Sequence, residues 1–260
     1  MPRLTRRAAA LTTRKLTPPL ALLTMLLCGC STPGVNHTYV AGPAHSTVID
    51  LLPGSPSAAV ETFPTSDHEL LGIAYDPFTD HLFLRIYPGN FIRVIDRPAG
   101  KIKRSFYVPN LLAGPGDLAI RSIDRHLFIA HPSLPAVVEI TPLGAIVRTL
   151  PLHNLQAPPA GVAYDQKKNR LLILQGGDLA HVGTYDLSGK RLAGVALDRN
   201  VRLTSLAYDS DAAEFYVPLL DQPAVGIFNA QGHLIRTLPS PTGRTNEFID
   251  VGPRSLIRMF

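Results

Sequence analysis

The residues of this chain whose types could do chemistry stand beside short apolar runs. Asp117 and Glu247 each open such a run, and Ser205 opens a third. A carboxylate can bind a cation or transfer a proton, and a histidine can act as a base or as a ligand. The other candidates for contact with a ligand lie in polar stretches between runs: Arg85, His131, Asp178 and His181.

Covalent catalysis finds little support in this sequence. No G-x-S-x-G motif is present, and the two cysteines, Cys28 and Cys30, both lie near the N-terminus. The segment "QGGD" at residues 175–178 has no predicted helix after it, so it does not indicate a phosphate site. We therefore expect a binding protein without catalysis and without a cofactor.

A repeat of about 44 residues organises the elements that must position these side chains. An aliphatic or aromatic marker recurs at steps of 45, 44 and 44 residues, and each marker follows an alanine. A large apolar residue that opens a second strand stands seven positions after each marker. The markers are Tyr75, Ile120, Tyr164 and Tyr208.

Each repeat then continues with a third apolar run, a turn that contains glycine, and a fourth run such as "IVRTLPL". Short runs bounded by Gly, Pro, Asn and Asp are typical of strands. Runs such as "LLIL" are apolar on both sides, which indicates strands buried on both faces. Four strands in each repeat predict one blade of an all-β propeller.

The ends of the chain supply a further blade. Residues 46–50 and 58–63 match the third and fourth strands, and residues 247–251 match the first. The second strand is either 37–41 or 255–260, and we favour the C-terminal segment. We therefore predict five blades of four antiparallel strands, in a ring closed by N- and C-terminal strands. The alternative is a six-bladed ring with one degenerate blade.

The pattern "GxAYD…(N/H)xLxI…V…D…G…RTL" over residues 46–251 is similar to NHL-type repeats, and to SMP-30-like lactonases and SdiA-regulated-like lipoproteins. This resemblance implies a binding platform, with a metal-dependent hydrolase as the alternative. SMP-30-like enzymes use a Glu, two Asn and an Asp around a divalent cation. Here Asp117 and Glu247 resemble part of that ring, but the two asparagines are missing at matching positions.

In such propellers, the loops that enter the first strands and those that join strands two and three meet at one mouth of the channel. The candidates named above fall in these loops, so we expect the ligand site at that mouth. If Asp117 and Glu247 hold no metal there, we expect these carboxylates to be solvated or to cap backbone N–H groups. The replacement of Glu247 by alanine would barely change stability. The expected partner is a protein, a peptide or a small molecule.

The N-terminal segment resembles a targeting sequence. Five basic residues precede a short apolar segment that ends in "LCGCS", which resembles a bacterial lipobox with Cys30 as its modified residue. The resemblance implies a signal peptide over 1–29, palmitate and diacylglyceryl chains on Cys30, and a tether over 30–42 before a propeller at 43–260. Ser31 after the cysteine resembles the outer-membrane sorting pattern, so we expect a lipid anchor in the cell envelope, facing the periplasm or the cell surface.

Charge excludes one class of partner. The full chain holds 25 basic and 20 acidic residues, but five of the basic residues lie in the predicted signal peptide. The remainder is therefore balanced at 20 of each sign. We expect no binding of nucleic acid, because the basic excess belongs to the targeting segment.

Overall fold

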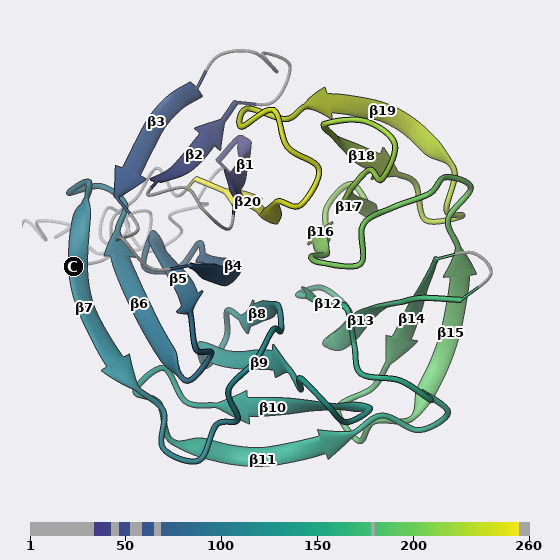
Figure 1. Ribbon diagram of the computed structural model, residues 1–260, viewed down its shortest axis with the longest axis horizontal. Helices are drawn as coiled ribbons and strands as arrows, with labels where there is room; N and C mark the ends of the chain where they lie inside the picture. The colour runs from purple at the N-terminus through teal and green to yellow at the C-terminus, as the bar shows by residue number, and fades with distance from the viewer. Residues whose placement is uncertain (1–33, 43–46, 53–58, 65–68, 178–179, 255–260) are drawn as a thin grey trace, which may run out of the picture. The chain divides into compact units, whose positions relative to one another are not determined.

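The computed structural model describes residues 34–42, 47–52, 59–64, 69–177 and 180–254, and within them it shows five four-stranded antiparallel sheets arranged as a ring (Figure 1). The predicted five-bladed propeller is confirmed, and the six-bladed alternative is wrong. Each repeat of the sequence forms one blade, because each supplies four strands joined by tight turns.

The strand bounds follow the repeat. Blade 1 contains β20 (Phe248–Pro253), β1 (Asn36–Ala41), β2 (Thr47–Leu51) and β3 (Ala59–Pro64). Blade 2 contains β4 (Leu70–Asp76), β5 (His81–Ile86), β6 (Phe91–Asp96) and β7 (Lys101–Tyr107). Blade 3 contains β8 (Leu118–Arg121), β9 (His126–Ala130), β10 (Ala136–Ile140) and β11 (Ile146–Pro151).

The last two blades are built in the same way. Blade 4 contains β12 (Gly161–Asp165), β13 (Arg170–Gln175), β14 (His181–Tyr185) and β15 (Arg191–Ala196). Blade 5 contains β16 (Ala207–Asp209), β17 (Glu214–Pro218), β18 (Ala224–Phe228) and β19 (Leu234–Pro239). The inner strand of each blade lies nearest the centre of the ring, and these are β20, β4, β8, β12 and β16 (Figure 1).

Ring closure differs from our expectation in one strand. The C-terminal strand β20 pairs with β1, in a register that runs from Asn36 opposite Pro253 to Ala41 opposite Phe248. The N-terminal segment 36–41 therefore fills the place for which we favoured 255–260, and the expected tether over 30–42 includes this strand. The physical reason is local: β1 also pairs with the adjacent β2, and five of its six residues are buried. Residues 255–260 lie outside the described residues.

The hydrophobic core lies between the blades. Five clusters of buried side chains each combine residues of two neighbouring blades. Phe128 of blade 3 stacks on Tyr164 of blade 4, for example, with ring centroids 5.4 Å apart. The six residues of β5 are all buried, whereas β7 at the rim of the same blade is largely exposed. Burial on both faces of the inner and middle strands confirms the prediction from the apolar runs.

Close approach of the inner strands explains two of the repeated glycines. A Cβ atom on Gly72 would lie 3.0 Å from the Cα atom of Asp117 in blade 3. A Cβ atom on Gly161 would lie 2.8 Å from the backbone nitrogen of Leu206 in blade 5. Only glycine allows the backbones to come this close, so these positions set the narrow centre of the ring.

An ion-pair network joins the closing blade to blade 2. Arg254, directly after β20, contacts Asp50 at 2.7 Å and Glu61 at 2.5 Å. Glu61 also receives Arg97 of blade 2 at 2.9 Å, and the same arginine pairs with Asp80. The network connects residues that are far apart in sequence, so it reinforces the closure that β1 and β20 make.

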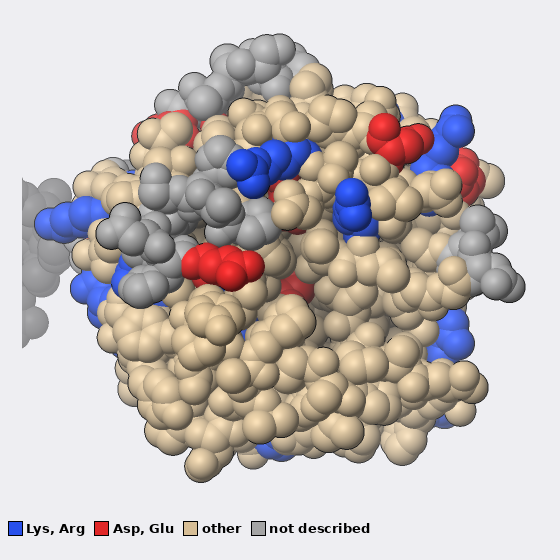
Figure 2. Space-filling view, in the orientation of Figure 1, with Lys and Arg blue, Asp and Glu red and all other residues tan. Residues whose placement is uncertain are grey.

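One part of the surface of the ring carries few charged side chains. Charged side chains are few over the lower half of the face in Figure 2, where β9, β10 and β11 lie in Figure 1. The visible described part of this face shows no continuous basic patch. Among the described residues, no helix is long and apolar enough to span a bilayer.

Removal of β1 should open the ring. We expect a chain that begins at Gly42 to lose its cooperative thermal unfolding transition, because β2 and β20 would each be left with an unpaired edge. A chain that begins at Ser31 is the matched control, and it should unfold cooperatively at the temperature of the full chain. Calorimetry and circular dichroism measure both. An unchanged melting temperature for the shorter chain would contradict this account of closure.

Candidate functional site

The ring has a cavity at each end of its central channel. The inner strands begin around a cavity of about 230 Å³, which is lined by proline, apolar residues and Thr204. They end around a second cavity of about 290 Å³. We call these ends the strand-start mouth and the strand-end mouth. The candidates from the sequence were expected at the strand-start mouth.

Two of those candidates lie inside the ring and hold its backbone. Asp117 is 1% exposed, and its Oδ2 atom accepts hydrogen bonds from the N–H groups of Leu206 at 2.9 Å and Val162 at 3.3 Å. Burial raises the pKa of the Asp117 carboxyl well above its usual range. Ser205 is fully buried, and its Oγ atom accepts from the N–H of Ile249 at 3.0 Å.

Arg85 and His131 support the loops of blades 2 and 3. Arg85 is fully buried and donates to the carbonyl oxygens of Gly89 at 2.6 Å, Gly116 at 2.8 Å and Leu112 at 3.2 Å. Burial lowers the pKa of this guanidinium to about 10. The Nδ1 atom of His131 accepts from the N–H of Leu134 at 3.0 Å, and burial followed by the charge of Arg85 lowers its pKa. Both side chains already have internal partners.

Glu247 is buried, so it is not a solvated carboxylate. Its Oε1 atom accepts from the hydroxyl groups of Ser240 at 2.7 Å and Thr242 at 2.5 Å, so it orders the loop before β20. These bonds argue against the expectation that alanine here would barely change stability, because the hydroxyl groups would lose their acceptor. His181 is half-buried at the start of β14, whereas Asp178 and Cys30 lie outside the described residues.

The structure does not gather the candidate metal ligands. In the described part of the chain, the one group of three possible ligands is Asp124, His126 and Glu139, which excludes both Asp117 and Glu247. Arg121 already forms ion pairs with both acids of that group, at 2.7 Å from Glu139 and 2.5 Å from Asp124. Its acids are therefore neutralised by the protein itself.

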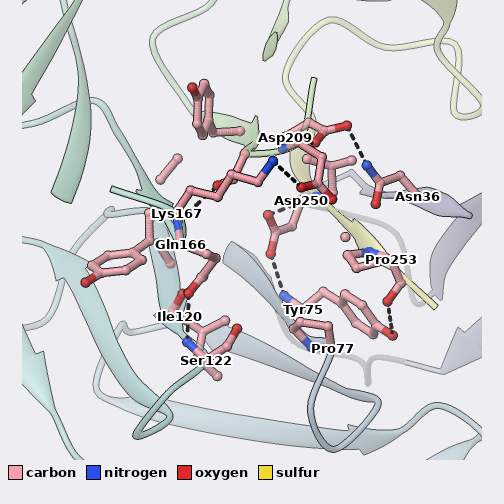
Figure 3. A pocket seen from close by; sticks show the side chains of 18 residues that line it. Asn36, Tyr75, Pro77, Ile120, Ser122, Gln166, Lys167, Asp209, Asp250 and Pro253 are labelled. Carbon is pink, nitrogen blue, oxygen red and sulfur yellow. Dashed lines mark hydrogen bonds and ion pairs between the residues drawn. The ribbon is translucent and has the colours of Figure 1, made fainter. Parts of the chain in front are cut away.

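The strand-end mouth holds a cavity that the sequence reasoning missed. Residues of all five inner strands line it, and Figure 3 shows Asp250 between Asp209 and Tyr75. Its walls are mainly tyrosine, alanine and aliphatic residues. Polar residues stand among them: Asn36, Ser122, Gln166, Lys167, Asp209, Ser210, Asp211 and Asp250.

Asp250 stands at the centre of this cavity (Figure 3). One of its carboxylate oxygens accepts from the N–H of Tyr75 in blade 2 at 2.5 Å, and the other from the N–H of Val251 at 2.8 Å. Burial raises the pKa of this carboxyl to about 7, despite those two hydrogen bonds. An acid with such a pKa in a cleft is a candidate for function.

A signal for Asp250 was present in the repeat. The residue before each marker is alanine in four blades, namely Ala74, Ala119, Ala163 and Ala207. In the closing blade the equivalent residue, before Val251, is Asp250. Ala119 and Ala163 line the cavity together with this aspartate. One carboxylate thus replaces a methyl group in a set of small residues around the axis.

Comparison with known proteins supports the fold. No protein-family model matches the sequence, and no curated protein matches it. A structure of a nidogen/laminin complex is similar with a TM-score of 0.58 and 13% identity, over 85% of this chain and 99% of that one. Glutaminyl cyclase from Myxococcus xanthus is similar with a TM-score of 0.52 and 14% identity, over 66% and 71%. At these identities the likeness concerns the fold alone.

The raised pKa of Asp250 gives a pH test. Between its usual pKa of 3.8 and its folded value of about 7, the folded state holds a proton that the unfolded state has lost. Stability from this group is therefore full below pH 4 and declines as the pH rises to 7. Asp250→Asn cannot ionise, so its melting temperature relative to the parent should rise over this range, by on the order of 5 °C, and level off above it.

The matched control is Asp221→Asn, which changes an exposed aspartate in the loop between β17 and β18. This variant should keep the pH dependence of the parent chain. Differential scanning calorimetry from pH 4 to pH 8 makes the comparison. An offset of Asp250→Asn that is the same at both ends of that range would show that the carboxyl is not perturbed.

Proposed function

We propose that this protein is a lipid-anchored propeller of the cell envelope that binds a small ligand at the strand-end mouth without catalysis. The cavity of about 290 Å³ at that mouth carries the proposal. Its size is close to the lower end of the range for ligand sites, and its composition matches them: apolar and aromatic walls with a few polar groups.

The polar groups of the cavity favour binding over chemistry. No histidine, cysteine or glutamate stands among the described residues that line it. No serine–histidine or cysteine–histidine pair of the kind that supplies an activated nucleophile therefore stands among those residues. Its two hydrogen bonds from backbone N–H groups hold the carboxylate in one orientation, which suits a fixed contact for a ligand.

The anchor would bring this mouth close to the membrane. Asn36 begins β1 and lines the cavity, and Cys30 stands six residues before it. Six residues span at most about 20 Å. A lipid on Cys30 would therefore keep the strand-end mouth within that reach of the bilayer surface, and the ligand would be met there.

Lipidation predicts a sharp difference between the two cysteines. In cells fed labelled palmitate, the full chain and Cys28→Ala should incorporate label and partition into detergent, because Cys28 leaves with the signal peptide. Cys30→Ala should incorporate none, because it lacks the acceptor sulfur. Equal labelling of Cys30→Ala, or equal loss in both variants, would contradict the proposed anchor.

Ligand binding can be located by NMR without knowledge of the natural ligand. We expect members of a library of small organic fragments to shift the amide signals of Tyr164, Tyr208 and Val251 around the cavity. Signals near Gly116 at the strand-start mouth should stay unchanged, and mass spectrometry should recover the fragments intact. Binding only at the strand-start mouth, or none at all, would contradict the proposal. Turnover that depends on a stoichiometric divalent cation would favour a hydrolase instead.

A further inference from the structure

We propose that the ligand of the strand-end cavity carries a positively charged amino group, which binds against the carboxylate of Asp250. This inference rests on the proposed function, since it names the chemical class of ligand for the same cavity. It follows from the balance of charge along the channel and from the size and lining of the cavity.

The charges that line the cavity do not balance. Three aspartates and one lysine line it. The amine of Lys167 already contacts Asp211 at 2.6 Å, on exposed side chains at the rim. Asp209 accepts from the amide of Asn36 at 2.5 Å and from backbone N–H groups of its own turn. Within the described part of the chain, no lysine or arginine contacts Asp250 or Asp209.

Three buried aspartates of this protein form an ion pair with an arginine. Asp76 pairs with Arg125 at 2.8 Å, and Asp165 pairs with Arg170 at 2.9 Å. Asp50 pairs with Arg254 at 2.7 Å. A buried carboxylate without a counter-charge is costly, and the raised pKa of Asp250 reflects that cost. Asp250 is partly exposed to the cavity and differs from these three acids, because no lysine or arginine among the described residues contacts it; the buried Asp117 and Asp209 share that difference.

A second carboxylate, that of Asp117, lies near Asp250, and the charge of Asp117 also acts on the guanidinium of Arg85. Asp117 is 1% exposed, and its Oδ1 atom has no hydrogen-bond partner among the described residues. The two acids lie close enough for the charge of Asp250 to raise the pKa of Asp117 further. A positive group that enters from the strand-end mouth would lower the energy of both carboxylates.

The cavity suits an organic ammonium better than a metal ion. A Ca²⁺ ion needs six to eight oxygen ligands, and the described residues place no group of three metal-ligating side chains here. The volume of about 290 Å³ is far larger than a bare ion requires. Tyr75, Tyr164 and Tyr208 are among the residues that line it, and each ring also packs on another ring of the core. Tyrosine rings at such a surface favour contact with ammonium groups.

Other titratable and charged groups around Asp250 set the background for a pH test. They come from β4, the segment before β8, β12 and the turn after it, and β16 with its following turn: Tyr75, Asp117, Tyr164, Lys167, Tyr208, Asp209 and Asp211. Burial raises the pKa of all three tyrosines, so none ionises near neutrality. Between pH 6 and pH 8 the ionisation of Asp250 should change the affinity; the pKa of Asp117 is raised as well, and the variant Asp250→Asn separates the two contributions.

Three probes of one size and different charge test the inference: benzylammonium, benzyl alcohol and benzoate. Calorimetric titration at pH 8 should give benzylammonium at least about tenfold tighter binding than benzyl alcohol, and benzoate the weakest. Asp250→Asn should abolish that advantage and leave benzyl alcohol unchanged within about twofold. The control Asp221→Asn should retain it. In the parent chain, benzylammonium should bind more weakly at pH 6 than at pH 8, whereas benzyl alcohol should not.

The outcomes separate this inference from the proposed function. Neutral fragments that bind in the cavity as well as benzylammonium, with no effect of Asp250→Asn, would overturn the charge assignment and leave the binding function in place. Failure of the whole fragment library would overturn both. Calcium that binds tightly, depends on Asp250 and excludes benzylammonium would replace the amine with a metal ion. If Asp250→Asn does not fold, the pH comparison on the parent chain decides.

Discussion

Five inner strands meet around one axis, and the backbone N–H groups that face the axis have no neighbouring strand to pair with. Each inner strand is bonded in its sheet on one side only. Three side chains take up these donors. Asp117 bonds backbone groups of blades 4 and 5, Ser205 bonds blade 1 from blade 5, and Asp250 bonds blade 2 from blade 1. A buried donor left without an acceptor is costly, so these bonds are a condition for the narrow ring.

The same condition explains why polar residues at strand openings are poor guides to chemistry in this fold. A carboxylate there can contact a ligand, or it can accept bonds from the strands across the channel. Asp117 uses one oxygen in the second way, and it reaches two other blades because it lies at the axis. Arg85 and Glu247 likewise hold loops. Side chains whose type would suit a ligand-binding or catalytic site thus form internal hydrogen bonds of the ring.

The sequence allowed the fold to be predicted more closely than the site. Repeat spacing located the blades because every blade needs the same four strands. In three blades an aspartate after the marker accepts from N–H groups of the turn: Asp76, Asp165 and Asp209. The closing strand was misassigned because both candidate segments are short and apolar, and only pairing in space distinguishes them. The site was missed for a different reason: the repeat departs from alanine at Asp250, but the repeat alone does not show which side chains line the cavity at each mouth.

Asp250 combines the two roles that the rest of the ring keeps apart. As an acceptor for Tyr75 it helps to close blade 1 onto blade 2, a task that a neutral side chain such as Ser205 performs elsewhere. The negative charge is therefore not needed for closure, and burial makes it unfavourable. Four alanines at the equivalent positions show that the ring does not require a polar group there. Positions at which a chain keeps a residue that lowers its stability are expected to be functional. This reasoning favours a ligand that supplies a positive charge beside Asp250.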